Sequence, residues 1–248
     1  TVLHTFKIAS LFLLSGLLIA CGGGSAGGTD TSAPPSNDVI QINFKFDNDT
    51  DGWAAGFADY PIGEDSAFEL TSGFTPLPAP LQSLAGFSVS GRNSSDDLFM
   101  FIKKKFNGFA GNSQYEIQFD LTFASNAPAG CIGVGGAPGE AVTLKAGASI
   151  TEPRAVNNGN NFNIMNIDKG NQKVGGSDAI VIGDFANSKN CDDNDFTYEL
   201  KTLKNDTTSY RVLTSADGSL WFTFSTDSGF ESTTRIYYIS GTITASKI

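Results

Sequence analysis

From residue 38 to the end of the 248-residue chain, apolar and polar side chains alternate with a period of two. The clearest run lies at 115–123, where every second residue is aromatic or aliphatic and those between are polar. Similar runs lie at 40–46, 67–71, 142–150, 196–200 and 236–243. Because successive side chains of a strand point to opposite faces, this pattern predicts antiparallel strands with one buried and one solvated face.

One further run, at 98–102, is continuously apolar and is typical of a central strand that is covered on both sides. Gly, Asn, Asp and Ser clusters separate the runs, as at 157–161, 192–195 and 215–218, and supply turn-forming residues. No stretch after residue 37 keeps a helical period. Residues 38–248 are therefore predicted to form one all-β domain, an antiparallel β-sandwich, with a jelly roll favoured by analogy among sandwich folds.

The first twenty residues have a different composition from this domain. One cation, Lys7, precedes an apolar run at 8–20 that is shorter than the roughly 20 residues of a membrane-spanning helix. The sequence Leu18-Ile19-Ala20-Cys21 then resembles the bacterial lipobox. That resemblance implies a lipoprotein signal peptide over residues 1–20, cleavage before Cys21, and lipid on the Cys21 thiol as a stable membrane anchor.

Residues 21–37 continue the chain with Gly, Ser, Thr and Pro and almost nothing to bury, which is typical of a solvated tether. Gly22 stands where proteobacterial lipoproteins retained in the inner membrane carry Asp. The expected location is thus the cell envelope, and the outer membrane if the host is Gram-negative.

The charge of the chain limits its partners. The formal net charge is -10, and it becomes -11 when the signal peptide is removed, because Lys7 is the only charged residue in that segment. Nucleic acids and anionic headgroups are bound through basic patches, so nucleic acid is not an expected partner.

The domain contains two cysteines, Cys131 and Cys191, and an exported domain is exposed to an oxidising compartment. They are predicted to form one disulfide, worth about 4 kcal/mol in the chain-entropy model. The only histidine, His4, lies in the signal peptide. Residues 21–248 therefore offer no Ser-His-Asp or Cys-His catalysis and no histidine-ligated zinc site, and no catalytic residue is assigned.

An acidic turn follows the first strand. Asp47, Asp49, Asp51 and Gly52 match the D-x-D-x-D-G opening of a calcium loop, in which alternate carboxylates converge on one cation. The twelfth position is Ala58 rather than Glu, which excludes a true EF-hand. Two interpretations stay open, a structural calcium site and a solvated acidic turn.

The two tryptophans also allow two interpretations. Trp221 alternates with the apolar residues 220, 222 and 224, which places its ring on the other, wet face of that strand. An exposed ring flanked by hydroxyls and carboxylates can stack on sugar rings. The alternative is that Trp221 lies under a loop or the second sheet. Trp53, beside the acidic turn, carries the same two alternatives.

Taken together, FKFDNDTDGW near the domain start, LFMFIKKKFNGFAGNSQYEIQFDLTFAS at its centre and the β-rich end resemble the jelly-roll carbohydrate-binding modules of secreted bacterial proteins. The resemblance implies a sugar-binding face with Trp53 or Trp221 and often a structural calcium, and it carries over no catalytic residue. The expected function is a lipid-anchored, non-catalytic glycan-binding module with polysaccharide as partner. The alternatives are a structural or adhesive envelope protein that binds another protein, and, third, a polysaccharide-active enzyme.

Overall fold

The computed structural model describes residues 38–248. Almost all of its regular structure is β, apart from the 3₁₀ turn η1 at Cys191–Asp193. No helix within residues 38–248 combines the length and apolarity needed to cross a membrane. The predictions for residues 1–37, including lipidation of Cys21, lie outside the described residues.

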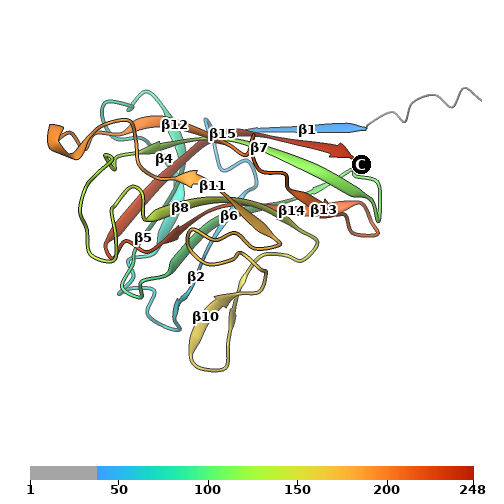
Figure 1. Cartoon of the computed structure of the whole chain (residues 1–248), viewed down its shortest axis with the longest axis horizontal. Helices are drawn as coiled ribbons and strands as arrows, with labels where there is room; N and C mark the ends of the chain where they lie inside the picture. The colour runs from blue at the N-terminus through green and yellow to red at the C-terminus, as the bar shows by residue number, and fades with distance from the viewer. Residues whose placement is uncertain (1–37) are drawn as a thin grey trace, which may run out of the picture. The chain divides into compact units, whose positions relative to one another are not determined.

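The first of two large antiparallel sheets, sheet A, has seven strands. Its path runs β12-β7-β15-β5-β4, with β1 also pairing β15 and β13 also pairing β7. Figure 1 shows β1 and β7 on either side of the long C-terminal β15. Its strands are β1 (Val39–Lys45), β4 (Thr71–Pro76), β5 (Ala85–Arg92), β7 (Gln114–Ser125), β12 (Glu199–Lys204), β13 (Arg211–Leu213) and β15 (Thr233–Lys247).

The second sheet, sheet B, has five strands in the order β11-β8-β14-β6-β2. A small third sheet, in the order β3-β10-β9, accompanies it. The strands of sheet B are β2 (Ala54–Ala58), β6 (Leu98–Asn107), β8 (Val142–Ser149), β11 (Ala179–Asp184) and β14 (Ser219–Ser228). Those of the small sheet are β3 (Tyr60–Pro61), β9 (Ala155–Asn157) and β10 (Phe162–Met165).

The pairing establishes the jelly roll directly. Four nested pairs, β5 with β15, β6 with β14, β7 with β12 and β8 with β11, are those of one long hairpin folded over itself. They alternate between the sheets, giving the orders β5-β15-β7-β12 and β6-β14-β8-β11. The predicted all-β antiparallel sandwich of jelly-roll type is confirmed.

The main core lies between sheets A and B. Its residues are the apolar members of the alternating runs, including Phe119 of β7, Phe222 and Phe224 of β14, and Ile243 of β15. Aromatic rings dominate this core, and the Phe119 and Phe224 centroids lie 5.7 Å apart across the two sheets. Burial of alternate residues is thus the main stabilising term, as the period of two predicted.

Sheet B has a second, smaller core on its outer face. The segment 150–178, which we call the cover segment, contains β9 and β10 and packs against this face. Phe99 and Phe101 of β6 and Met165 of β10 form this second core. Figure 1 shows the β10 hairpin extending away from sheet B. The cover segment therefore buries the outer face of β6, as the continuously apolar run at 98–102 predicted, and it also covers outward polar residues of β8 and β14 such as Lys145 and Asp227.

Candidate functional site

The outer face of sheet A carries three rows of polar side chains, which we call the polar rungs. Each rung runs across neighbouring strands in register, beginning on β1 and crossing β15 and β7. With strands about 4.8 Å apart, a rung that reaches β12 spans roughly 14 Å. The rungs are Gln41, Thr244 and Gln118; Asn43, Thr242, Asp120 and Lys204; and Lys45, Ser240, Thr122 and Thr202.

Inward residues of the same strands hold the rungs in place. On β1, Phe44 is 4% exposed, and its ring packs 5.3 Å from that of Phe224 of the opposite sheet. Opposite Phe44, Gly241 leaves room for that ring, because a Cβ there would lie 2.4 Å from the Phe44 ring edge. The flanking residues Asn43 and Thr242 consequently point outward from a rigid, well-packed sheet.

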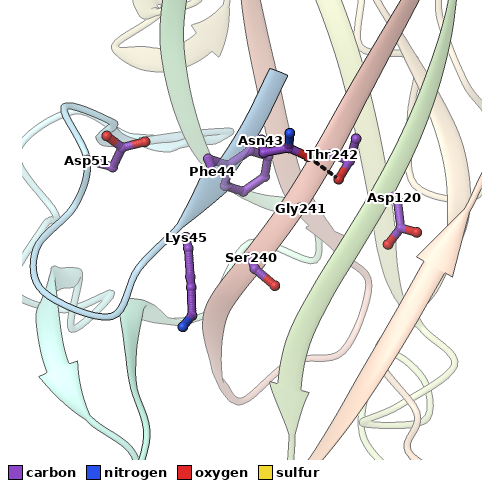
Figure 2. Close-up of a pocket in the computed structure, with 8 residues that line it drawn as sticks. All are labelled: Asn43, Phe44, Lys45, Asp51, Asp120, Ser240, Gly241 and Thr242. Carbon is purple, nitrogen blue, oxygen red and sulfur yellow. Dashed lines mark hydrogen bonds between the residues drawn. The ribbon is translucent and has the colours of Figure 1, made fainter. Parts of the chain in front are cut away.

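The middle rung lies in a shallow hollow of about 530 Å³. Figure 2 shows the hydrogen bond that the Thr242 hydroxyl donates to the Asn43 side-chain oxygen, 2.9 Å long, with Asp120 on the neighbouring β7. A second hollow of about 240 Å³ shares Asp120 and Thr242 with the first and extends it toward Gln41 and Gln118. The two hollows adjoin at Asp120 and Thr242, and together we call them the groove.

Several neutral groups of the rungs have no hydrogen-bond partner among residues 38–248. They include the amide nitrogen of Asn43, the side chains of Gln41 and Gln118, and the hydroxyls of Ser240 and Thr244. Amides and hydroxyls both donate and accept hydrogen bonds. The face is therefore able to bind a ligand that presents many donors and acceptors and little charge.

Charged side chains also line this groove, and two of them, Lys45 and Lys204, are paired with carboxylates. Lys204 donates to Asp120 at 2.7 Å, and this hydrogen bond raises the pKa of Lys204. Lys45 pairs with Asp47 at 2.9 Å, and its hydrogen bond lowers the pKa of that carboxyl. Asp120 is the one carboxylate of the rungs, and the lining of the two hollows also includes Asp51 and Asp206.

The predicted site residue Trp53 lies in the core instead. It is 3% exposed, with its ring centroid 4.8 Å from that of Phe44 and 5.7 Å from that of Phe224. A ring enclosed in this way has no face on which a sugar could stack. Of the two interpretations of Trp53, the structure supports the core position.

Trp221 lies on the outer face of sheet B and is half-buried. The Lys103 ammonium sits 5.4 Å from the ring centroid, and the same ammonium donates to Glu152 and to the Pro153 carbonyl at the start of the cover segment. Trp221 therefore borders the cover segment, on the sheet opposite the polar rungs. The structure does not bring the two tryptophans together on one face.

The three aspartates of the acidic turn have separate partners. Asp47 pairs with Lys45, Asp49 accepts the backbone N–H of Asp51 at 2.6 Å, and the Asp51 carboxylate lies 3.3 Å from the Lys104 ammonium. Residues 38–248 contain no group of three or more His, Cys, Asp or Glu side chains arranged to hold a metal ion. The arrangement is that of an acidic turn, and the calcium site stays a prediction.

Cys131 and Cys191 form a disulfide, with their Cα atoms 5.0 Å apart. It joins the glycine-rich loop before β8 to η1, sixty residues later in the sequence. The predicted pairing is confirmed.

Sequence reasoning did not single out the rungs as a site. The alternation placed Gln41, Asn43, Gln118 and Asp120 on a wet face, which is correct, but nothing in it shows which strands are neighbours. Only the register of β1, β15 and β7 aligns residues about 200 positions apart, such as Asn43 and Thr242.

No protein-family model and no curated protein matches the sequence. Among solved structures, the xylan-binding domain CBM22-1 of Paenibacillus barcinonensis Xyn10C aligns at TM-score 0.39 and 14% identity, over 87% of this chain and 99% of that one. TmCBM61 in complex with β-1,4-galactotriose aligns at TM-score 0.34 and 6% identity, over 78% of this chain and 88% of that one. The K3 cleaved adhesin domain of Lys-gingipain from Porphyromonas gingivalis aligns at TM-score 0.36 and 12% identity, over 84% of this chain and 99% of that one.

Other matches are much longer than this chain. It spans 20% of the enzymatically active domain of bacteriophage CBA120 tailspike protein 4 and 28% of a Clostridium thermocellum xylanase 10B fragment. Several of the matched proteins are carbohydrate-binding modules. All of these TM-scores lie below 0.5, so the similarities by themselves carry no argument about what this protein binds.

Proposed function

We propose that residues 38–248 form a non-catalytic glycan-binding module that binds polysaccharide on the polar rungs of sheet A. The observation that carries the proposal is the row of unpartnered neutral amides and hydroxyls beside Asn43 and Thr242, held in an open groove on a rigid sheet. Sugar hydroxyls donate and accept hydrogen bonds, as do these groups.

The rungs contain no aromatic ring, so binding rests on hydrogen bonds rather than on stacking. Each hydrogen bond contributes only about 0.5–1.5 kcal/mol net, because it replaces one made to water. An extended chain that reaches several rungs is consequently a better ligand than a single sugar. The open groove also suits a chain that passes along the surface.

The lipid anchor and the envelope location are part of this proposal. Lipid on Cys21 would hold the module to a membrane, the outer one in a Gram-negative host, and residues 22–37 would tether it. A tethered module of this kind would keep a polysaccharide close to the cell surface.

The test is retention of residues 38–248, which hold the whole described core and the disulfide, on xylan, β-1,4-galactan, cellulose, chitin and peptidoglycan. Asn43→Ala and Gln118→Ala together remove two rung amides. Asn160→Ala removes an exposed amide on the cover segment and is the matched control. We expect retention on at least one polysaccharide, lost in the double variant and kept in the control.

Two results would overturn the proposal. One is retention on none of these materials. The other is retention that survives the double variant but is lost in Trp221→Ala, which would move the binding site to sheet B.

A second function, binding of another envelope protein, is favoured by one observation. On the loop beside Cys131, Ile132 is fully exposed and Val134 is 68% exposed, so two aliphatic side chains face solvent on a segment held by the disulfide. Loss of envelope-protein crosslinks in Ile132→Ser, with glycan retention unchanged, would assign this loop a protein-binding role.

A further inference from the structure

A buried ionic cluster lies between the outer face of sheet B and the cover segment. The side chains of Lys145 on β8 and Asp227 on β14 are both fully buried. Lys169 of the cover segment joins them, with its ammonium 3.0 Å from Asp227 and 2.9 Å from Asp59. Burying charges is costly even when they are paired. The cluster therefore needs an explanation beyond stability.

The Lys145 amine is aimed at the Asp227 carboxyl. Its Nζ lies 2.7 Å from Asp227 Oδ2, and it also donates to the carbonyls of Lys169 at 2.8 Å and Val174 at 3.0 Å. A neutral amine has two N–H bonds and one lone pair. With its two N–H bonds on these carbonyls, the lone pair would face Asp227. Burial, the largest cause, lowers the pKa of Lys145 and so favours this neutral form.

A third carboxyl, Asp97, completes the arrangement. Asp97 and Asp227 each have a buried Oδ1 without a hydrogen-bond partner among the described residues. Burial first, and then the charge of Asp227, raise the pKa of Asp97 to about 7. A side-chain hydrogen bond with Asp227 is also among the causes of this shift, so a protonated Asp97 is placed to donate to the Asp227 carboxyl. Asp97 can thus hold a proton beside the carboxyl that faces the amine.

We propose that Lys145 and Asp227 condense to an intramolecular isopeptide bond, with Asp97 as the catalytic acid. The Lys145 ammonium first passes one proton to the Asp227 carboxylate, which leaves a neutral amine beside a protonated carboxyl. The amine lone pair then attacks Cγ of Asp227, forming the C–N bond, and Asp97 donates its proton to the departing hydroxyl. The nitrogen releases a second proton, which reprotonates Asp97. The C–O bond breaks and one water leaves. An ammonium and a carboxylate thereby become one neutral amide and one water, and nothing is oxidised or reduced.

Burial is what makes the condensation favourable. In water, hydrolysis of an amide is favoured, but a fixed amine and carboxyl reach effective concentrations of about 10⁵–10⁸ M. The reaction also removes two buried charges, and Lys169 keeps Asp59 as its partner. The new bond would join neighbouring strands β8 and β14 across 82 positions of sequence, in addition to the disulfide.

Lys103 and Glu152 provide an internal control. Their ammonium and carboxylate are also 2.7 Å apart, but the Glu152 side chain is 46% exposed, and water can reach and solvate its charge. No condensation is expected for this pair.

The test is the intact mass of the reduced, denatured full chain, followed by peptide mapping. We expect the measured mass to be lower by one water than the mass calculated for the same reduced polypeptide without the bond. Peptide mapping should find a branched peptide that links Lys145 to Asp227, with Lys103 and Glu152 unlinked. The variants Lys145→Arg and Asp97→Asn should both have the mass calculated from their sequences, with no water lost. Circular dichroism would check that these variants fold.

The wild-type chain decides the proposal whether or not a variant folds. A wild-type protein of full mass without a branched peptide would overturn it. A folded Asp97→Asn protein that still lacks one water would overturn the role assigned to Asp97.

Discussion

The outward residues of β1, β7 and β15 on sheet A and of β14 on sheet B follow the same polar alternation in sequence, but their surroundings in the structure differ. On sheet A, Asn43, Gln118 and Thr242 meet solvent in an open groove. On sheet B, the corresponding outward residues of β14, such as Ser225 and Asp227, are buried by the cover segment. A polar period of two therefore identifies a face that points away from the main core, whether or not that face reaches water.

The largest difference between the faces should appear when one carboxylate is removed from each. Asp227→Ala removes the carboxyl group that Lys145 and Lys169 share, and with it the proposed bond to Lys145. Loss of the buried ion pair alone is expected to lower the free energy of unfolding by about 3–5 kcal/mol. Asp120→Ala removes the partner of the exposed Lys204 and should leave the urea midpoint almost unchanged. Urea unfolding measures both. Equal effects would mean that the two faces are equally solvated.

The tryptophans allow a second test. Trp53→Ala opens a cavity between the sheets and should cost about 3–5 kcal/mol. Trp221→Ala should cost less, because its ring is only half-buried. Acrylamide should quench the fluorescence of Trp221 and have little effect on that of Trp53. Each signal can be measured alone in a single-tryptophan protein, Trp53→Phe for Trp221 and Trp221→Phe for Trp53. Strong quenching of Trp53 would contradict the core position.

The buried cluster on sheet B should also make the stability of the protein depend on pH. The pKa of Asp97 is raised from 3.8 to about 7, mainly by burial, so the folded state holds a proton that the unfolded state releases. The unfolding free energy contributed by this group is fully present below pH 4 and is lost as the pH rises through 7. The melting temperature of the wild type should fall over this range by more than that of Asp97→Asn. If the melting temperatures of the two proteins changed in parallel with pH, Asp97 would not be the group that holds the proton in the folded state.

The smallest expected effect concerns the acidic turn. Each of its carboxylates already has a separate partner, so a chelator should leave the melting temperature unchanged. A lower melting temperature with EDTA, restored by calcium, would support the calcium site that the sequence predicts.

The sequence was sufficient for the fold class because alternation determines which residues enter the core. Runs at 40–46, 115–123 and 236–243 correspond closely to β1, β7 and β15. The predicted strand at 67–71 is wrong, because 65–69 form turns and β4 begins only at Thr71, and the run at 196–200 begins too early, since β12 starts at Glu199. Short runs of alternation occur by chance in turns, whereas long ones rarely do.

The candidate site could be predicted only in part. The disulfide followed from composition and compartment. Trp53 was misplaced as a site candidate because a tryptophan beside an acidic turn can face either way, and its burial depends on Phe44 and Phe224, which approach from other strands. The polar rungs and the ionic cluster depend on strand register and on the cover segment, neither of which local sequence encodes.

The most direct test of the central claim is to titrate soluble xylan, β-1,4-galactan and cello-oligosaccharides into isotope-labelled residues 38–248. The side-chain amide NMR signals of Asn43, Gln41 and Gln118 report from the rungs, and the indole signal of Trp221 reports from sheet B. The account predicts that one of these glycans shifts the rung amides and leaves the indole unchanged. Shifts confined to the indole and the cover segment, or none with any glycan, would contradict it.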